Sequence, residues 1–425
     1  MRSISLYDRV RRKSFLHQAW RDIRQNAIAS KSIETKSEVS EFEIEIDKHL
    51  KRIKDQLRER RYHFQPAKGQ LLKRPGKKPR PIVVAPIGDR IVQRSILLVL
   101  KGIATVKALL EQPRSYGGIP KRGVKDAVRE VHEAITKAGR YYIKSDIIEF
   151  FARVPHPEAL SQLMRVLPDR SLDDLLQEAT TTELANMDQL AEHSEEFPIH
   201  EIGIAQGCSL SPLLANIVLH DFDRAVNSHD IICLRYIDDF LILGPTDRAV
   251  WAAFRKGTRI LQNLGLDAYN PKDRSGKAME GSTERRIEFL GCDISRGFIQ
   301  PSKKAQARLL EKIRKLTRQS TRFFEKPYKV SSDYEKRSLA ATLRMISNIV
   351  RAWGNQYSFC NADQVFAALD QDIDELMRKY IGTYATMRER FDKSNQRRML
   401  GVHLLVDSKR DPVLAYRKRT GARDE

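Results

Sequence analysis

The chain has 425 residues, a formal net charge of +21 at pH 7 and 41% hydrophobic residues. This length and apolar content are sufficient for two or three packing units. The charge predicts a polyanionic partner, and nucleic acid is favoured over a membrane because no lipidation motif or amphipathic membrane anchor is present. No run of about 18 apolar residues occurs, and no apolar segment follows the basic start of the chain. We therefore expect a cytoplasmic protein.

The cysteines lie far apart in the sequence. They are Cys208, Cys233, Cys292 and Cys360. None of their spacings is that of a zinc site, and their scatter is not typical of a disulfide framework. The pattern therefore predicts buried thiols.

Residues 1–60 carry apolar residues at helical spacing between charged neighbours, which predicts a helical extension. The first stripe comprises Leu16, Ala19, Trp20 and Ile23, and the second comprises Ile46, Leu50, Ile53 and Leu57. A packing face is the simplest interpretation of both stripes. Basic groups at 11–13 and 51–52 lie on the exposed faces of these helices and are candidates for contacts with phosphates.

Two short strand-like runs flank a basic Pro/Gly turn within residues 71–84, which predicts a hairpin. Arginine offers bidentate donors to phosphate oxygens, and lysine adds a compact positive charge. Lys73 and Arg80 are therefore candidates for binding a triphosphate, and a solvated basic loop is the alternative. The glycine-rich loop at 115–123 could bring backbone N–H groups to a phosphate, but it lacks the ending of a P-loop.

Residues 231–244 contain two apolar, β-prone runs on either side of Asp238 and Asp239. This pattern predicts a β-hairpin with its carboxylates at the tip, and the alternative is a solvated turn. Asp146 ends a strand-like run that begins at residue 141, and its alternative role is a helix N-cap. Carboxylates packed at one sheet edge repel each other unless a cation lies between them. The pattern therefore indicates a divalent metal, as in phosphoryl transfer.

The sequence Tyr-Ile-Asp-Asp at 236–239 resembles the Tyr-x-Asp-Asp signature of reverse transcriptases, and residues 146–151 resemble their first catalytic motif. Ordered family blocks extend over roughly residues 15–300. The resemblance implies an α+β polymerase shaped as a right hand, with fingers, an antiparallel-sheet palm and a helical thumb. It also implies RNA-directed DNA synthesis from dNTPs with two Mg²⁺ ions, for which Mn²⁺ is an alternative.

The resemblance assigns roles to individual residues. The catalytic residues are Asp146, Asp238, Asp239 and Lys272. The metal-binding residues are Asp146, Ile147, Asp238 and Asp239. The substrate-binding residues are Lys73, Arg80, Phe151, Gln206, Gly207 and Tyr236. The primer grip is formed by Phe289, Leu290 and Gly291. Lys272 would protonate the departing pyrophosphate. Phe151 would exclude a ribose 2′-hydroxyl, whereas Phe150 belongs to the core.

We expect five parts along the chain. They are an N-terminal helical extension at 1–60, fingers with part of the palm at 61–140, the palm at 141–300 with an acidic insertion at 168–198, a helical thumb at 301–377, and a basic C-terminal extension at 378–425. The insertion is expected to be a helical decoration of the palm with a solvated face. The thumb is predicted from three apolar stripes at helical spacing. The extension is expected to bind RNA or to be partly disordered.

By resemblance, the most similar group comprises stand-alone bacterial reverse transcriptases of the defence-associated kind, which work with a structured non-coding RNA. That RNA and the DNA product are the expected partners. Several alternatives stay open. They are a retron enzyme, a group II intron-type reverse transcriptase or maturase, a template-independent nucleotidyl transferase, and an RNA-binding scaffold without polymerase activity.

Overall fold

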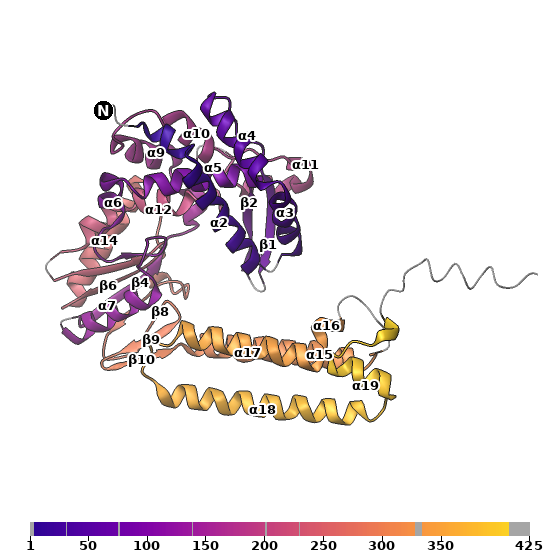
Figure 1. Ribbon diagram of the computed structural model, residues 1–425. Coiled ribbons are helices and arrows are strands. Elements are labelled where there is room, and N and C mark those ends of the chain that lie inside the picture. Colours follow the sequence, from indigo (N-terminus) through magenta and orange to yellow (C-terminus); the bar gives the residue numbers. More distant parts are fainter. Residues whose placement is uncertain are drawn as a thin grey trace, which may run out of the picture. The chain divides into compact units, whose positions relative to one another are not determined.

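The computed structural model of the chain divides into two compact units, Met1–Arg285 and Arg286–Glu425 (Figure 1). The residues that the structure describes are 4–30, 32–74, 77–137, 139–199, 202–228, 230–327 and 334–407. Within these ranges, no helix combines the length and the apolar character that a membrane span requires. The first unit contains every site residue predicted from the sequence except the three of the primer grip.

The first unit is built around a five-stranded sheet with the order β3-β5-β6-β4-β7. Its strands are β3 (Ser115–Tyr116), β4 (Tyr141–Asp146), β5 (Ile232–Tyr236), β6 (Asp239–Gly244) and β7 (Met279–Ser282). The pairs β5–β6, β6–β4 and β4–β7 are antiparallel, whereas the short β3 is parallel to β5. The predicted α+β fold with an antiparallel-sheet palm is therefore confirmed, and β3 is a parallel addition at one edge.

Strand β6 lies inside this sheet and is covered on both faces. Its residues Phe240 to Leu243 are each at most 1% exposed. Helix α14 (Asp247–Asn263) packs on β4 and β6, and the ring of Phe254 lies 6.3 Å from that of Phe240. Phe222 of α13 (His220–Val226) approaches the same ring at 5.3 Å. Because β6 is paired with a strand at both edges and is buried, the register of the residues at its end is fixed.

Helices form most of the rest of the first unit. They are α1 (Leu6–Val10), α2 (Lys13–Ala29), α3 (Ile33–Ile44), α4 (Ile46–Arg58), α5 (Ile87–Leu100), α6 (Ala104–Leu110), α7 (Val124–Lys137), α8 (Phe150–Arg153), α9 (His156–Arg165), α10 (Asp173–Thr180), α11 (Met187–Leu190), α12 (Ser211–Val218) and α13 (His220–Val226), with 3-10 turns η1 (Ala191–Glu196) and η2 (Pro271–Asp273). Helices α1–α4 agree with the helical spacing seen in the first 60 residues. Both predicted stripes are largely buried, including Leu16, Trp20 and Leu57.

A separate two-stranded hairpin consists of β1 (Lys68–Arg74) and β2 (Lys77–Val84). The predicted Pro75-Gly76 turn lies outside the described residues. The base of the hairpin is bonded to the acidic insertion: the N–H of Ala67 donates to the Glu183 carbonyl at 2.7 Å, and the N–H of Ala185 donates to Ala67 at 2.8 Å. The insertion therefore forms backbone hydrogen bonds with the segment that leads into the hairpin.

Asn186 of the insertion makes a two-point contact with Gly69 of β1. Its Oδ1 accepts a hydrogen bond from the Gly69 N–H at 2.8 Å, and its Nδ2 donates to the Gly69 carbonyl at 3.0 Å. A Cβ added at Gly69 would meet Leu190 at 2.7 Å, so the insertion also packs closely on the strand. A small apolar core joins the two segments and comprises Ala67, Val83, Leu190, Phe197 and Ala205. The insertion therefore supports the hairpin as well as facing solvent.

The second unit combines a small sheet with long helices. Its strands are β8 (Ile287–Phe289), β9 (Cys292–Ser295) and β10 (Phe298–Pro301), and they form an antiparallel sheet. Its helices are α15 (Lys303–Phe324), α16 (Tyr334–Arg337), α17 (Leu339–Gln356), α18 (Asp363–Arg388) and α19 (Lys393–Leu400), followed by the 3-10 turn η3 (Leu405–Asp407). Helix α15 packs against α17 and α18, and Figure 1 shows the three running alongside each other. The predicted helical character after residue 301 is confirmed.

Helix α18 continues through residue 378, where the sequence analysis placed the start of a C-terminal extension. Tyr380 and Tyr384 lie beyond that position and are buried in a cluster with Phe323, Phe324 and Met399. The hydroxyl groups of Tyr380 and Ser320 are 2.6 Å apart. Helices α18 and α19 therefore both pack into this unit and contribute residues to its core. Residues 408–425 of the predicted extension lie outside the described part of the chain.

Two cysteines that are distant in the sequence meet in the second unit. All of the cysteines are free thiols, but Cys292 of β9 is hydrogen-bonded to Cys360, which follows α17. This bond, together with burial, raises the pKa of the Cys292 thiol, while the same bond lowers the pKa of Cys360. The spacing of the cysteines gave no sign of this contact.

We predict that Asn186→Ala loosens the β1–β2 hairpin. The substitution removes both partners of the Gly69 backbone, and an unsatisfied backbone group costs about 1–3 kcal/mol. Amide hydrogen exchange should accelerate in β1 and β2. Gln189→Ala, at an exposed position of α11, serves as the control and should leave the exchange unchanged. Equal protection of the hairpin in both variants would show that Asn186 does not support it.

Candidate active site

The tip of the β5–β6 hairpin carries the predicted carboxylates. Tyr236 and Asp239 face each other across the ladder, so Ile237 and Asp238 form a two-residue turn. Ile237 has a φ of 61°, a left-handed conformation that β-branched residues rarely adopt. Such strain costs of order 1–3 kcal/mol and persists only where the surrounding structure enforces it. The turn is therefore held in a specific shape.

Asp146 lies directly opposite Asp239 in the register of β4 and β6. Side chains of directly opposed residues lie on the same face of a sheet, where like charges destabilise each other. The N–H of Ile147 donates to the carbonyl of Asp238 at 3.1 Å. The structure thus brings the three predicted carboxylates to the ends of two neighbouring strands, although they are about 90 positions apart in the sequence.

The electrostatic surroundings of Asp238 are those of a partly buried acid near positive charges. Burial raises the pKa of Asp238 above its usual value. Backbone hydrogen bonds and the charges of Arg80 and Arg235 act in the opposite direction. Arg80 lies on β2, so its influence places the β1–β2 hairpin within electrostatic reach of the carboxylates. A cation at this position would favour the ionised form of Asp238.

The donors available here fit a hard divalent cation such as Mg²⁺. Asp146, Asp238 and Asp239 offer carboxylate oxygens, whereas Ile147 can contribute only its backbone carbonyl. No group of three or more His, Cys, Asp or Glu side chains converges as a metal cage in the described ranges. Mg²⁺ is commonly bound by one or two carboxylates together with water and substrate phosphates. The residues therefore fit a metal shared with a phosphate-bearing ligand.

Phe150 and Phe151 follow Asp146 on the short helix α8. Phe150 is 2% exposed and lies in the core, which confirms its predicted position. Phe151 is half-buried, and its ring lies 5.6 Å from that of Phe150. Glu149 precedes the helix with a φ of 48° and turns the chain between Asp146 and the two rings. Phe151 therefore keeps part of its surface exposed, and its role as a sugar gate stays a prediction.

The loop of Gln206 and Gly207 is joined to the β1–β2 hairpin. The N–H of Val83 in β2 donates to the Gln206 carbonyl at 2.8 Å. Gly207 has a φ of 133°, and a Cβ at this position would lie 2.1 Å from the Val83 carbonyl oxygen. Only glycine fits that approach. The close approach to Val83 is a structural reason for glycine at position 207, which the sequence did not indicate. It adds to the predicted role of Gly207 beside the substrate.

Other predicted residues are distributed around these elements. Lys73 on β1 and Arg80 on β2 are exposed. Tyr236 is half-buried at the end of β5, and a Cβ added at Gly117 of the glycine-rich loop would lie 3.1 Å from its ring. The ammonium of Lys272 lies 4.8 Å from the centre of the Trp251 ring on α14. The catalytic role of Lys272 stays a prediction.

The predicted primer-grip residues belong to the second unit. Phe289 is 2% exposed in the core, which agrees with the packing alternative for this residue. Leu290 and Gly291 form the turn between β8 and β9, and both have positive φ values of 49° and 79°. The Ser302 N–H donates to the Gly291 carbonyl at 2.9 Å and fixes this turn. The hairpin is thus well supported, and its contact with a primer stays a prediction.

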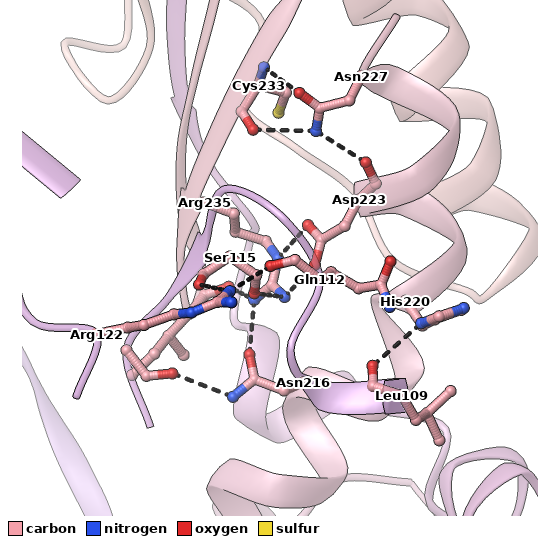
Figure 2. A network of polar contacts seen from close by, with 12 residues as sticks. Leu109, Gln112, Ser115, Arg122, Asn216, His220, Asp223, Asn227, Cys233 and Arg235 are labelled. Carbon is pink, nitrogen blue, oxygen red and sulfur yellow. Dashed lines mark hydrogen bonds and ion pairs between the residues drawn. The ribbon is translucent and has the colours of Figure 1, made fainter. Parts of the chain in front are cut away.

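A buried polar network beneath the β5–β6 turn was missed by the sequence analysis. Arg235 of β5 is 1% exposed and points toward Asp223, Asn216 and Ser115, as Figure 2 shows. The available signal was a charged residue inside an otherwise apolar strand, since a buried arginine needs partners. The partners come from other elements, so the sequence pattern around Arg235 could not identify them.

The segment with this geometry matches a family model. The model described as "Reverse transcriptase (RNA-dependent DNA polymerase)" matches residues 71–294. Protein YkfC of Escherichia coli (strain K12) is 29% identical over 179 residues, which cover 41% of this chain and 44% of that protein. Group II intron-encoded protein LtrA of Lactococcus lactis subsp. cremoris is 26% identical over 183 residues, which cover 42% of this chain and 28% of that protein. The chain thus spans less than half the length of these relatives.

Two solved structures are similar to this chain at low TM-scores. A partial Cas6-RT-Cas1–Cas2 complex has a TM-score of 0.36 and 22% identity, and the match covers 62% of this chain and 43% of that chain. Telomerase from Candida albicans, in complex with a fragment of telomeric RNA, has a TM-score of 0.41 and 13% identity, and the match covers 84% of this chain and 67% of that chain.

We predict that Asp238→Asn weakens the binding of divalent cations, because it replaces a charged oxygen ligand by a neutral amide at the same position. Titration with Mn²⁺, followed by electron paramagnetic resonance, should show an affinity reduced by at least about tenfold. Asp247→Asn changes an exposed acid at the start of α14 and provides the matched control. Identical Mn²⁺ affinities for the two variants would rule out Asp238 as a ligand.

Proposed function

Because the chain belongs to the reverse transcriptase (RNA-dependent DNA polymerase) family, we propose that it copies RNA into DNA at the site formed by Asp146, Asp238 and Asp239. The observation that carries this proposal is the pairing of Asp146 with the Asp238–Asp239 turn inside the segment that matches the family. The substrates are a primer with a free 3′-hydroxyl, an RNA template and dNTPs. We place the reaction in the cytoplasm, where dNTPs and RNA meet.

Asp146, Asp238 and the Ile147 carbonyl would hold two Mg²⁺ ions, with Mn²⁺ as an alternative and Asp239 as the supporting acid. Bound divalent cations supply positive charge that activates the primer hydroxyl and stabilises the leaving pyrophosphate. The chain contributes orientation: β4 and β6 hold the carboxylates close together, and positive charge between them would lower their mutual repulsion. This coupling supports binding of metal and nucleotide phosphates at the same place.

Lys73 and Arg80 would bind the triphosphate of the incoming nucleotide. Both are exposed on the β1–β2 hairpin, and the charge of Arg80 already acts on Asp238. Gln206 and Gly207 connect to the same hairpin through Val83, which supports a role beside the nucleotide. Lys272 would protonate the pyrophosphate. In the second unit, the Phe289–Gly291 hairpin would hold the primer end.

The expected nucleic acid partner is RNA. The net charge of +21 supports extensive phosphate contacts, which provide most of the affinity in such complexes. We propose that a structured non-coding RNA serves as template and scaffold, in the setting of a stand-alone bacterial enzyme of antiviral defence. The presence of Asp146, Asp238 and Asp239 favours an active polymerase over a scaffold without activity.

A second setting is supported by the relative LtrA, a group II intron-encoded protein. A retron or intron-type enzyme, including a maturase, would use the same carboxylates and would differ in its RNA. Sequencing the RNA that co-purifies with the protein, together with any DNA attached to it, separates these settings. A template-independent transferase would instead extend a primer without any RNA template.

We predict that the protein extends a DNA primer on an RNA template with dNTPs and that Asp238→Asn abolishes extension. Activity should fall by more than about 100-fold, which exceeds the loss typical of residues one step removed from a metal. RNA binding, measured by fluorescence anisotropy, should stay nearly unchanged because it depends on the basic surface. Asp247→Asn is the control and should extend normally. Wild-type-like extension by Asp238→Asn would disprove the assigned centre.

We also predict that Phe151→Val relaxes the choice of sugar. A ring beneath the sugar leaves no room and no hydrogen-bond partner for a 2′-hydroxyl, so its removal should relieve about 1–3 kcal/mol of discrimination against rNTPs. Incorporation of single matched dNTPs and rNTPs measures the ratio. Phe15→Val, at another half-buried aromatic residue, controls for general loosening. The gate is refuted if the ratio is the same in all three proteins.

A further inference from the structure

A charged pair is buried beneath the turn that carries Asp238. The Nε and Nη2 atoms of Arg235 donate to the two carboxylate oxygens of Asp223 at 2.7 and 2.5 Å. The side chains are only 1% and 4% exposed. Burying two charges has a large desolvation cost, and well-packed apolar residues of similar volume often give equal or greater stability. Stability alone therefore does not explain why an ion pair occupies this position.

Arg235 uses its remaining donors to join several elements around the turn. Its Nη1 donates to the Ile237 carbonyl at 2.9 Å and to Asn216 of α12 at 3.0 Å. Its Nη2 also donates to Ser115 of β3 at 2.7 Å. Figure 2 shows the Asp223, Asn216 and Ser115 side chains converging on the guanidinium. The planar fork of arginine fixes all of these directions at once, which the single ammonium of lysine cannot do.

Both backbone groups of Ile237 are thereby held. Its N–H donates to the Tyr116 carbonyl at 3.2 Å, and its carbonyl accepts from Arg235. Ile237 is the residue with the strained left-handed φ, and such a conformation requires external constraints. Asp238 follows directly in the chain. The position of its carboxylate therefore depends on the backbone of Ile237, which is hydrogen-bonded to Tyr116 and to Arg235.

We propose that Arg235, oriented by Asp223, is a positioning residue for the reaction: it holds the Ile237 carbonyl so that Asp238 stays opposite Asp146 in the geometry that binds metal. This inference rests on the proposed function of the same site. Arg235 itself is buried and would act through the Ile237 carbonyl rather than by contact with metal or substrate. Its effect is that of outer partners of metal ligands, which orient the ligand and tune its affinity.

The first test is the double variant Arg235→Met with Asp223→Leu, which removes both charges together. Its thermal midpoint should fall only modestly: apolar replacement of a buried pair is often neutral or stabilising, but the Ile237 carbonyl and the Asn216 and Ser115 side chains each lose a donor. Mn²⁺ affinity and kcat should nevertheless each fall by about 10- to 100-fold. The KM for dNTP should change little, because Arg235 makes no contact with the nucleotide-binding hairpin.

Arg235→Lys provides a second test that does not depend on the apolar replacement. It keeps the buried cation opposite Asp223 but loses the bidentate fork, so Mn²⁺ affinity and kcat should fall as in the double variant. This variant decides the test if the double variant does not fold. The matched control is Arg94→Met with Asp22→Leu, which removes a 2.6 Å ion pair between α5 and α2, away from the turn. The control should alter neither Mn²⁺ affinity nor kcat.

Wild-type Mn²⁺ affinity in the folded Arg235 variants would overturn the inference, as would a loss that appears only in proportion to the unfolded fraction. The proposed function is judged separately by extension with the wild-type protein. If the wild type lacks polymerase activity, Mn²⁺ affinity still decides whether Arg235 positions Asp238. Reduced affinity in the Arg235 variants, with normal affinity in the control, would support the inference.

Discussion

The register of β4 and β6, which places Asp146 directly opposite Asp239, is the constraint on which the structure of this site depends. The buried strand β6 fixes this register, and like charges that face each other directly across a sheet destabilise each other. Burial already disfavours the charged form of Asp238. The positive charge of Arg80 on the basic hairpin acts in the opposite direction and favours the ionised form of Asp238.

The acidic insertion helps to organise this positive side of the site. Its contacts with Ala67 and Gly69 join an acidic segment to a basic hairpin, while Gly207 lets the palm loop lie directly against Val83 on the same hairpin. The hairpin is therefore attached on two sides. A movement of the hairpin toward a nucleotide would have to carry these neighbours or break their hydrogen bonds. The net charge of the chain does not indicate this arrangement, because it sums the acidic insertion and the basic hairpin, which contact each other.

The sequence predicted features that depend on local patterns. Apolar runs around Asp238 identified the hairpin, and helical spacing identified the N-terminal and thumb helices. Contacts between distant segments could not be predicted in this way, because neither partner carries a local signal. Arg235 with Asp223 and Cys292 with Cys360 are examples. The expected boundary at residue 378 lies inside helix α18. The sequence did not indicate that the helix continues, because core residues such as Tyr380 are widely spaced there among charged surface residues.

The strained residue Ile237 shows how packing and function are combined in one turn. A glycine would adopt its φ without strain, but the isoleucine side chain packs against the core of the first unit. A Cβ at Gly117 would lie 2.7 Å from Ile237 Cγ1, so the glycine-rich loop leaves room for that side chain. The two residues are thus mutually adapted. Packing of the isoleucine side chain offsets part of the backbone strain, and the hydrogen bond from Arg235 holds the Ile237 carbonyl. Precision at Asp238 therefore comes from residues that carry no catalytic group.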